Sequence, residues 1–202
     1  VFLNKQTRDG RPIKKGNVPD VMPGAEDTWQ SYGYGWANAS NTPLRMFKQY
    51  DHEGGIRVPL IVRWPAVVRG NGRITHQVCH VMDILPTVLE AAGVEYPETS
   101  GGRRIDPADG KSMVPILRRQ RRKGHNALFW KYEHGCAVRQ GRWKLVRMDK
   151  KPWELYDIEA DPVELVNLAG KFPKRVAQLS DLWQHWHATA ADKKASKKKN
   201  NK

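Results

Sequence analysis

The sequence lacks long apolar runs and has very few cysteines. No stretch approaches the roughly 20 apolar residues that a membrane-spanning helix needs, so a transmembrane span is not predicted. Only two of the 202 residues are cysteine, Cys79 and Cys136. Two cysteines cannot build the disulfide framework of a small secreted domain. We therefore expect free thiols, with a single bridge as the alternative.

Acidic residues are also scarce, with 21 Asp+Glu against 35 Lys+Arg and a formal net charge of +14. Such a charge favours polyanionic partners: nucleic acid, anionic lipid or sulfated glycans. Much of the excess is local, in RRQRRK at 118–123 and in the lysine-rich tail. The tail composition predicts disorder, either as a solvated end or as a polyanion contact. Charge without a groove-reading motif does not predict specific nucleic-acid binding.

The sequence begins at Val1 and lacks a charged-then-apolar signal segment. A length of 202 residues suits one full domain or part of a larger one. We therefore expect the natural N-terminus to be missing, through processing or because the chain is part of a longer protein.

The most informative stretch joins a cationic loop to an apolar run. It reads NTPLRMFK at 41–48 and EGGIRVPLIVRWP at 53–65. Gly54 and Gly55 allow positive φ or close backbone approach, and the run 58–62 predicts a strand covered on both faces. Arg45 and Lys48 are therefore expected on a loop at the rim of a buried sheet, where α/β enzymes place ligand-binding groups.

Residues 78–94 predict a strand followed by a helix. Asp83 suits the N-cap, Pro86 lies in the first turn, and Gly93 suits the C-terminal stop. The helix positions between them carry an apolar stripe. We interpret Asp83 as a structural cap rather than an acid catalyst.

The last third of the chain predicts a small antiparallel sheet with a packed helix. Gln140-Gly141 predicts a tight hairpin, and Pro173 starts a helix with one apolar stripe. The predicted strands are rich in aromatic and β-branched residues and cover 127–133, 136–139, 142–146 and 154–157.

Four segments resemble the sulfatase family, in the family's order, between about Trp29 and about Trp186. The family patterns are N-x-P-L-R-x-x-K with E-G-G-x-R-V-P and R-W-P, D-x-x-P-T-x-L-x-x-A-G, G-K-S-L-x-P-x-L, and a C-terminal strand pattern. They match residues 41–65, 83–93, 110–117 and 137–162. The resemblance implies an α/β fold: the C-terminal part of an alkaline-phosphatase-like sandwich, followed by a small antiparallel sheet plus helix.

The resemblance also implies a division of the chain into three parts. Residues 1–122 are the C-terminal part of the catalytic domain, truncated at its N-terminus and carrying an insertion at 5–28. Residues 123–190 are the small sheet-plus-helix subdomain. Residues 191–202 are the disordered basic tail.

For chemistry, the resemblance implies sulfate-ester hydrolysis by a formylglycine nucleophile, made from a C-x-P-x-R motif, with a calcium ion on oxygen ligands. Neither Cys79 nor Cys136 begins that motif, and the Asp-Asn-Gly that supplies calcium ligands is absent. We therefore expect the nucleophile and most calcium ligands upstream, no metal ligand in this chain, and no activity from it alone. The resemblance implies a periplasmic or secreted location. It also implies a sulfate-ester substrate, with sulfated polysaccharide as one candidate.

One family active-site residue maps onto this sequence: Lys48, the sulfate-contacting catalytic lysine. Its compact ammonium suits a tetrahedral anion, and an ordinary surface lysine is the alternative. His52 and Arg45 are further candidates for substrate binding. His52 can instead be a loop histidine bonded to backbone, and Arg45 can either bind an anion bidentately or brace the loop.

Two other functions stay open on the sequence alone. One is a non-catalytic polyanion-binding module derived from a sulfatase. The other is a phosphatase or phosphonate hydrolase of the same superfold. An upstream C-x-P-x-R motif would separate an active sulfatase from the binding module.

Overall fold

The computed structural model describes residues 4–31, 33–68 and 72–200, with only the backbone for 192–200. Contacts within the chain divide it into two compact units. Unit 1 comprises Val1–Val58 and Phe129–Lys202, and unit 2 is Pro59–Leu128. Within the described ranges, no helix is long and apolar enough to span a bilayer.

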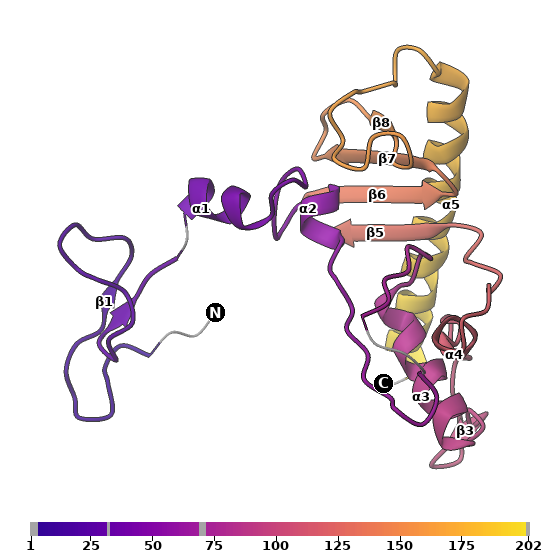
Figure 1. Ribbon diagram of the computed structural model, residues 1–202, viewed down its shortest axis with the longest axis horizontal. Helices are drawn as coiled ribbons and strands as arrows, with labels where there is room; N and C mark the ends of the chain where they lie inside the picture. The colour runs from indigo at the N-terminus through magenta and orange to yellow at the C-terminus, as the bar shows by residue number, and fades with distance from the viewer. Residues whose placement is uncertain (1–3, 32, 69–71, 201–202) are drawn as a thin grey trace. The chain divides into compact units, whose positions relative to one another are not determined.

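Unit 1 contains a four-stranded sheet in the order β5-β6-β7-β8 (Figure 1). The hairpin between β6 and β7 is confirmed, and Gly141 closes it at φ +59°. β7 pairs antiparallel with β8 in turn. The strands are β5 (Leu128–Tyr132), β6 (Gly135–Gln140), β7 (Trp143–Met148) and β8 (Glu154–Asp157). The predicted strands are therefore all present: β8 has the predicted ends, and the ends of β5, β6 and β7 are shifted by one or two residues.

Helix α5 (Pro173–Asn200) packs on this sheet against β6 and β7. Leu179 and Trp183 are buried on its inner face, and the Trp183 indole donates to the Trp130 carbonyl at 3.2 Å. One buried hydrophobic cluster of unit 1 consists of Ala137, Val146, Tyr156 and Ile158. The predicted helix start at Pro173 is confirmed.

α5 continues into the segment 191–202, for which the composition predicts disorder. Its helical backbone reaches Asn200. Alanine and lysine have high helix propensity, so a lysine-rich end can extend a helix that its first turns have already nucleated. Residues 201–202 lie outside the described residues.

The N-terminal part of unit 1 has little regular structure. β1 (Lys14–Lys15) pairs in parallel with β2 (Thr28–Trp29), and α1 (Gly33–Ser40) follows. Helix α2 (Glu53–Ile56) is a single turn that ends the cationic loop. The loop that joins α1 to α2 therefore has a defined beginning and end.

In unit 2, the predicted helix is present as the 3-10 turn η1 (Val81–Asp83) and helix α3 (Ile84–Ala92). Gly93 ends α3 in the left-handed conformation at φ +66°. The unit also has β3 (Thr99–Ser100) paired with β4 (Arg103–Arg104), and α4 (Val114–Leu117). The predicted C-terminal stop at Gly93 is confirmed.

The strand predicted at 58–62 is wrong for this structure. No strand is assigned there within the described part of unit 2, and Ile61 is 91% exposed. A strand exists only with a neighbour that accepts and donates its backbone hydrogen bonds. The described residues offer this segment no such neighbour, and its apolar side chains stay on the surface.

Asp83 occupies the predicted N-cap position of α3, but its side chain makes no capping hydrogen bond to that helix; it is instead a buried acceptor that holds unit 2 together. Its carboxylate accepts from the amides of His80 at 2.9 Å and Lys111 at 2.8 Å. Arg122 Nη2 and His125 Nε2 lie 2.6 and 2.7 Å from its two oxygens. Burial opposes ionisation, yet these hydrogen bonds outweigh it and lower the pKa of Asp83 to about 2.

The same carboxylate explains why the segment at 110–112 meets the start of α3. A side chain at Gly110 would place its Cβ 1.9 Å from the Met82 carbonyl oxygen, so only glycine fits this approach. The Thr87 hydroxyl then accepts from the Met113 amide at 2.8 Å. The segments 83–93 and 110–117 are thereby joined by hydrogen bonds from backbone amides of the second to side chains of the first.

Asp83→Asn should unfold α3 locally, because it leaves the buried Arg122 guanidinium without its counter-charge. Removing one partner of a buried pair costs about 3–5 kcal/mol. Hydrogen exchange of peptides covering 84–92 should therefore lose most of its protection at pH 7. Exposed Asp109→Asn is the matched control, and it should leave protection unchanged.

The pH dependence gives the same prediction a second readout. A carboxyl with a depressed folded pKa stabilises above its unfolded pKa, near 4, and loses this contribution as the pH falls toward 2. The difference in protection between wild type and Asp83→Asn should therefore shrink between pH 4 and pH 2. A difference that stays constant over this range would contradict the assignment.

Candidate functional site

The candidate site is the loop of residues 41–57, which we call the Lys48 loop. Asn41 Nδ2 donates to the carbonyls of Met46 at 3.2 Å and Gly54 at 3.0 Å, and so joins its two halves. The Gly54 amide donates back to the Arg45 carbonyl at 2.8 Å. Met46 and Gln49, on either side of Lys48, have positive φ angles of 64° and 86°. Such backbone is sustained only where the surroundings fix it.

Gly54 and Gly55 are required by close backbone approach, one of the two predicted reasons. A Cβ at Gly54 would lie 2.1 Å from the Met46 carbonyl oxygen. A Cβ at Gly55 would lie 1.9 Å from the Tyr50 carbonyl oxygen. Any side chain at either position would push the first part of the Lys48 loop, residues 45–50, away from α2.

A buried ammonium joins the Lys48 loop to the sheet. Lys144, on β7, has no exposed side-chain surface, and its Nζ lies 2.9 Å from Glu53 Oε1 and 2.8 Å from Glu164 Oε1. The second oxygen of Glu164 accepts from the Glu53 amide at 2.8 Å. Arg57 approaches Glu53 Oε2 at 3.8 Å, so two cations face two carboxylates. This buried charge balance is what such groups need.

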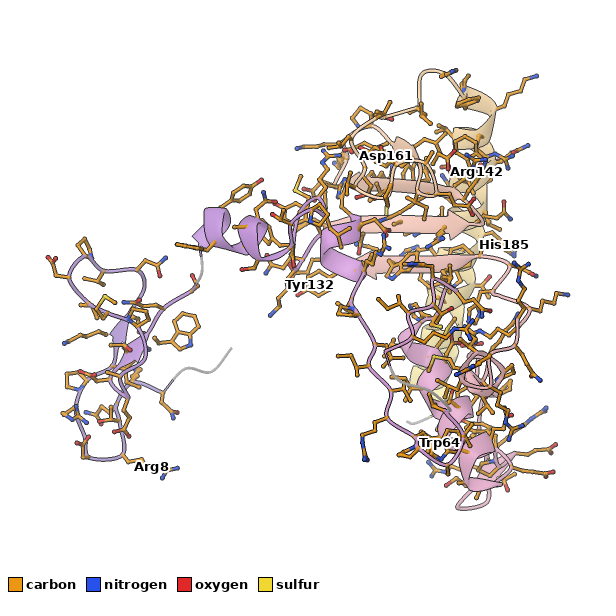
Figure 2. The ribbon with its side chains drawn as sticks, viewed as in Figure 1. Arg8, Trp64, Tyr132, Arg142, Asp161 and His185 are labelled. Carbon is orange, nitrogen blue, oxygen red and sulfur yellow. The ribbon has the colours of Figure 1, made fainter. Side chains whose placement is uncertain are left out.

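The segment that carries Glu164 is itself fixed on β8. Glu164 has a positive φ of 58°. Asp161, labelled in Figure 2, accepts from the Val166 amide at 2.8 Å. Asn167 Oδ1 accepts from the Leu155 amide at 3.1 Å. Glu164 is therefore presented to Lys144 by a braced turn.

A second polar cluster lies beside the first, centred on Glu154. Arg45 Nη1 donates to Glu154 Oε2 at 2.8 Å and also to the Tyr156 hydroxyl. His52 Nε2 lies 3.3 Å from the same carboxylate oxygen, and the Tyr156 hydroxyl donates to it. The pKa of Glu154 is lowered to about 2. The largest cause is the hydrogen bond from His52, and burial acts in the opposite direction. The hydrogen bonds from Tyr156 and Arg45 lower this pKa further. Burial and the Glu154 charge raise the pKa of Tyr156.

The three predicted site residues are therefore placed differently. Lys48 is exposed, and within the described residues no ion pair reaches its ammonium. Arg45 is half-buried against Glu154 and makes the contacts of a loop brace. His52 is buried and turned toward Glu154, a side chain rather than the backbone. A substrate contact for any of the three stays a prediction.

The partners of this loop were missed by the sequence reasoning. Lys144, Glu154 and Glu164 lie about a hundred residues further along the chain, and no local pattern links them to residues 41–57. One signal exists in β7. Alternate residues of a strand share a face, so Lys144 is in phase with the core residue Val146. A lysine in a core position predicts a buried carboxylate partner.

No metal centre is found among the described residues, where no group of three His, Cys, Asp or Glu side chains could hold an ion. Cys79 and Cys136 are both free thiols, as expected. Burial raises the pKa of each, with hydrogen bonds from Arg122 and Arg147 opposing it. A raised pKa disfavours the thiolate, which is the nucleophilic form of cysteine.

The model of the family described as N-sulphoglucosamine sulphohydrolase, C-terminal, matches residues 45–190 of this chain. A sulfatase of Formosa agariphila is 34% identical over 184 residues, covering 81% of this chain and 32% of the relative. An uncharacterized sulfatase of Schizosaccharomyces pombe is 34% identical over 164 residues, covering 78% and 29%. The chain thus spans about a third of the length of these curated relatives.

Solved structures show the same relationship. One is described as Ps i-CgsB in complex with k-i-k-neocarrahexaose, with a TM-score of 0.58, 25% identity, and coverage of 72% of this chain and 32% of that one. A Bacteroides thetaiotaomicron structure described as BT33336S-sulf has a TM-score of 0.54, 25% identity, and coverage of 68% and 30%. This likeness confirms the predicted α/β class, with the small antiparallel sheet and helix at its C-terminal end. The chain therefore belongs to the sulfatase family, and it corresponds to the C-terminal portion of these enzymes.

Proposed function

We propose that this chain supplies the sulfate-contacting lysine and the C-terminal subdomain of an enzyme that hydrolyses a sulfate ester. The observation that carries the proposal is an exposed Lys48 on a loop that buried charges fix to the sheet. Family membership supports the reaction class. In this proposal, the formylglycine nucleophile and the calcium ion are held by residues outside this chain.

The chemical task of Lys48 is electrostatic. A sulfate oxygen gains negative charge as sulfur is attacked, and a fixed cation lowers the energy of that state. A flexible lysine would lose side-chain and loop entropy at this moment. The braced loop has already lost its backbone entropy on folding, so the backbone that carries the Lys48 side chain is positioned in advance. Glu53, Lys144 and Glu164 are positioning residues in this account, because they act through the loop.

For substrate we propose a sulfated carbohydrate. The net charge of +14 favours an anionic chain. Relatives support this class by name, among them an N-acetylglucosamine-6-O-sulfatase of Bacteroides thetaiotaomicron, 30% identical over 67% of this chain. A choline-sulfatase of Rhizobium meliloti is also a relative, so sequence similarity alone does not select a carbohydrate substrate. The positive net charge is the additional reason for proposing one. A periplasmic or secreted location would suit a polymeric substrate.

The 202-residue chain alone should not hydrolyse an aryl sulfate, with or without added calcium, because it has no C-x-P-x-R motif. Release of the phenol, followed by absorbance, measures this directly. Turnover above that of a purified Lys48→Ala sample would contradict the division of labour proposed for this chain.

In the full-length protein, Lys48→Ala should lower kcat/KM by roughly 10²–10³, the usual loss for one preorganised donor. Lys48→Arg should restore only part of it, since a planar fork does not superimpose on a point charge. The melting temperature should stay unchanged, because the side chain is exposed. Lys150→Ala, on another exposed turn, is the control. Near-wild-type kcat/KM with a lower melting temperature would make Lys48 structural.

Lys144→Met should destabilise unit 1 by about 3–5 kcal/mol, because it leaves Glu53 and Glu164 charged and buried without their cation. Urea unfolding followed by tryptophan fluorescence measures the loss. Lys150→Met is the matched control and should cost little.

A triple variant tests whether charge imbalance is the cause. Glu53→Gln and Glu164→Gln added to Lys144→Met remove both uncompensated carboxylates, and stability should recover by more than half. If the triple variant is less stable than Lys144→Met alone, the network contributes shape rather than charge balance.

A further inference from the structure

A second cationic feature of the chain is separate from the Lys48 loop in sequence and lies in unit 2. Residues 118–123, RRQRRK, follow helix α4, and we call them the basic loop. From 110 to 128 the sequence has six Lys and Arg and no Asp or Glu. No acidic neighbour along the chain therefore offsets this charge.

Arg122 anchors the basic loop by pointing inward. Its guanidinium donates to Asp83 at 2.6 Å, to the Lys111 carbonyl at 2.5 Å and to the Val78 carbonyl at 3.0 Å. Its side chain is only 5% exposed. Arg122 therefore stabilises the fold of unit 2, and its charge is balanced by Asp83.

The backbone of the basic loop is also held. Gln77 clamps it from both sides, donating to the Gln120 carbonyl at 3.1 Å and accepting from the Arg122 amide at 3.3 Å. The Gln120 amide donates to the Pro115 carbonyl at 2.8 Å. At the far end, the Lys111 ammonium donates to the Gly124 carbonyl at 2.7 Å. A loop fixed in this way loses little entropy when it binds a partner.

The remaining cations face solvent. Arg118, Arg121 and Lys123 are exposed, and in the described part of the chain none of them is in an ion pair. Arg119 is exposed beside them at a positive φ of 66°. The fold therefore presents Arg118, Arg121 and Lys123 to solvent on a short, held loop, whereas the inward Arg122 is paired with Asp83.

We propose that the basic loop binds the sulfated polysaccharide chain of the substrate at sulfate groups away from the reacting one. The proposal rests on the sulfated-carbohydrate substrate proposed above. Guanidinium groups bind the oxygens of tetrahedral anions bidentately, and several of them on one loop match an anion that repeats along a polymer. The loop has no aromatic side chain on which a nucleobase would stack, which disfavours single-stranded nucleic acid.

The test is retention of the full 202-residue chain on immobilised heparin, used as a sulfated-polysaccharide probe, with unsulfated dextran as the blank. The test variant is Arg118→Gln, Arg121→Gln and Lys123→Gln together. The control variant is Lys150→Gln, Lys151→Gln and Lys174→Gln, which removes the same charge from exposed positions in unit 1. Both keep Arg122, so the fold of unit 2 is preserved.

We expect the affinity of wild type for heparin to fall with salt, and the slope of log affinity against log salt to drop by about two to three in the test variant. Each lost contact removes roughly one unit of that slope. The control variant should lose less than one. Equal losses in both variants, or none in the test variant, would overturn the proposal.

Two further measurements complete the test. A single-stranded oligonucleotide of similar charge should bind more weakly than heparin at equal salt, and tighter, loop-dependent binding would assign the surface to nucleic acid and overturn it. In the full-length protein, the test variant should keep kcat/KM on a small aryl sulfate. Lys48→Ala should lose hydrolysis and keep its heparin retention. Hydrolysis retained in Lys48→Ala would overturn the proposed function, whereas an unchanged salt slope in the test variant would overturn the basic-loop proposal.

Discussion

The buried ammonium of Lys144 is the interaction on which the arrangement of unit 1 depends. It lies between Glu53, which opens helix α2 below the Lys48 loop, and Glu164, on the turn after β8. A lysine buried without these carboxylates would lose its charge or unfold the sheet. The carboxylates, equally, would repel one another without it. One cation thus fixes a loop to a strand about 90 residues away, and this loop carries Lys48.

Unit 2 uses the same physical device with the signs reversed. Asp83 is a buried anion among donors from His80, Lys111, Arg122 and His125, and it joins the start of α3 to the segment that precedes the basic loop. In both units, glycines let the backbone approach where the charges require it. Gly55 does so beside α2, and Gly110 does so beside η1. The short motifs that resemble the sulfatases are therefore largely the anchors of loops.

Local features of the fold could be predicted from the sequence. The hairpin at Gln140-Gly141, the strands around it and the start of α5 depend on turn chemistry and periodicity, which neighbouring residues decide. The strand predicted at 58–62 failed because strand formation depends on partners, and apolar composition alone does not supply them. The contacts of Arg45 and His52 could not be predicted either, since Glu154 lies about a hundred residues away. Lys48 could be placed on a loop, but its bracing through Lys144 is a tertiary property.

The central claim is that Lys144 acts on catalysis through the position of Lys48. A double-mutant cycle in the full-length protein tests it most directly, with kcat/KM measured well below the melting temperature of every variant. If the claim holds, Lys144→Met lowers kcat/KM in the wild-type background and has almost no further effect in the Lys48→Ala background. If the two losses add on a logarithmic scale, the buried network and the functional lysine are independent, and the account is contradicted.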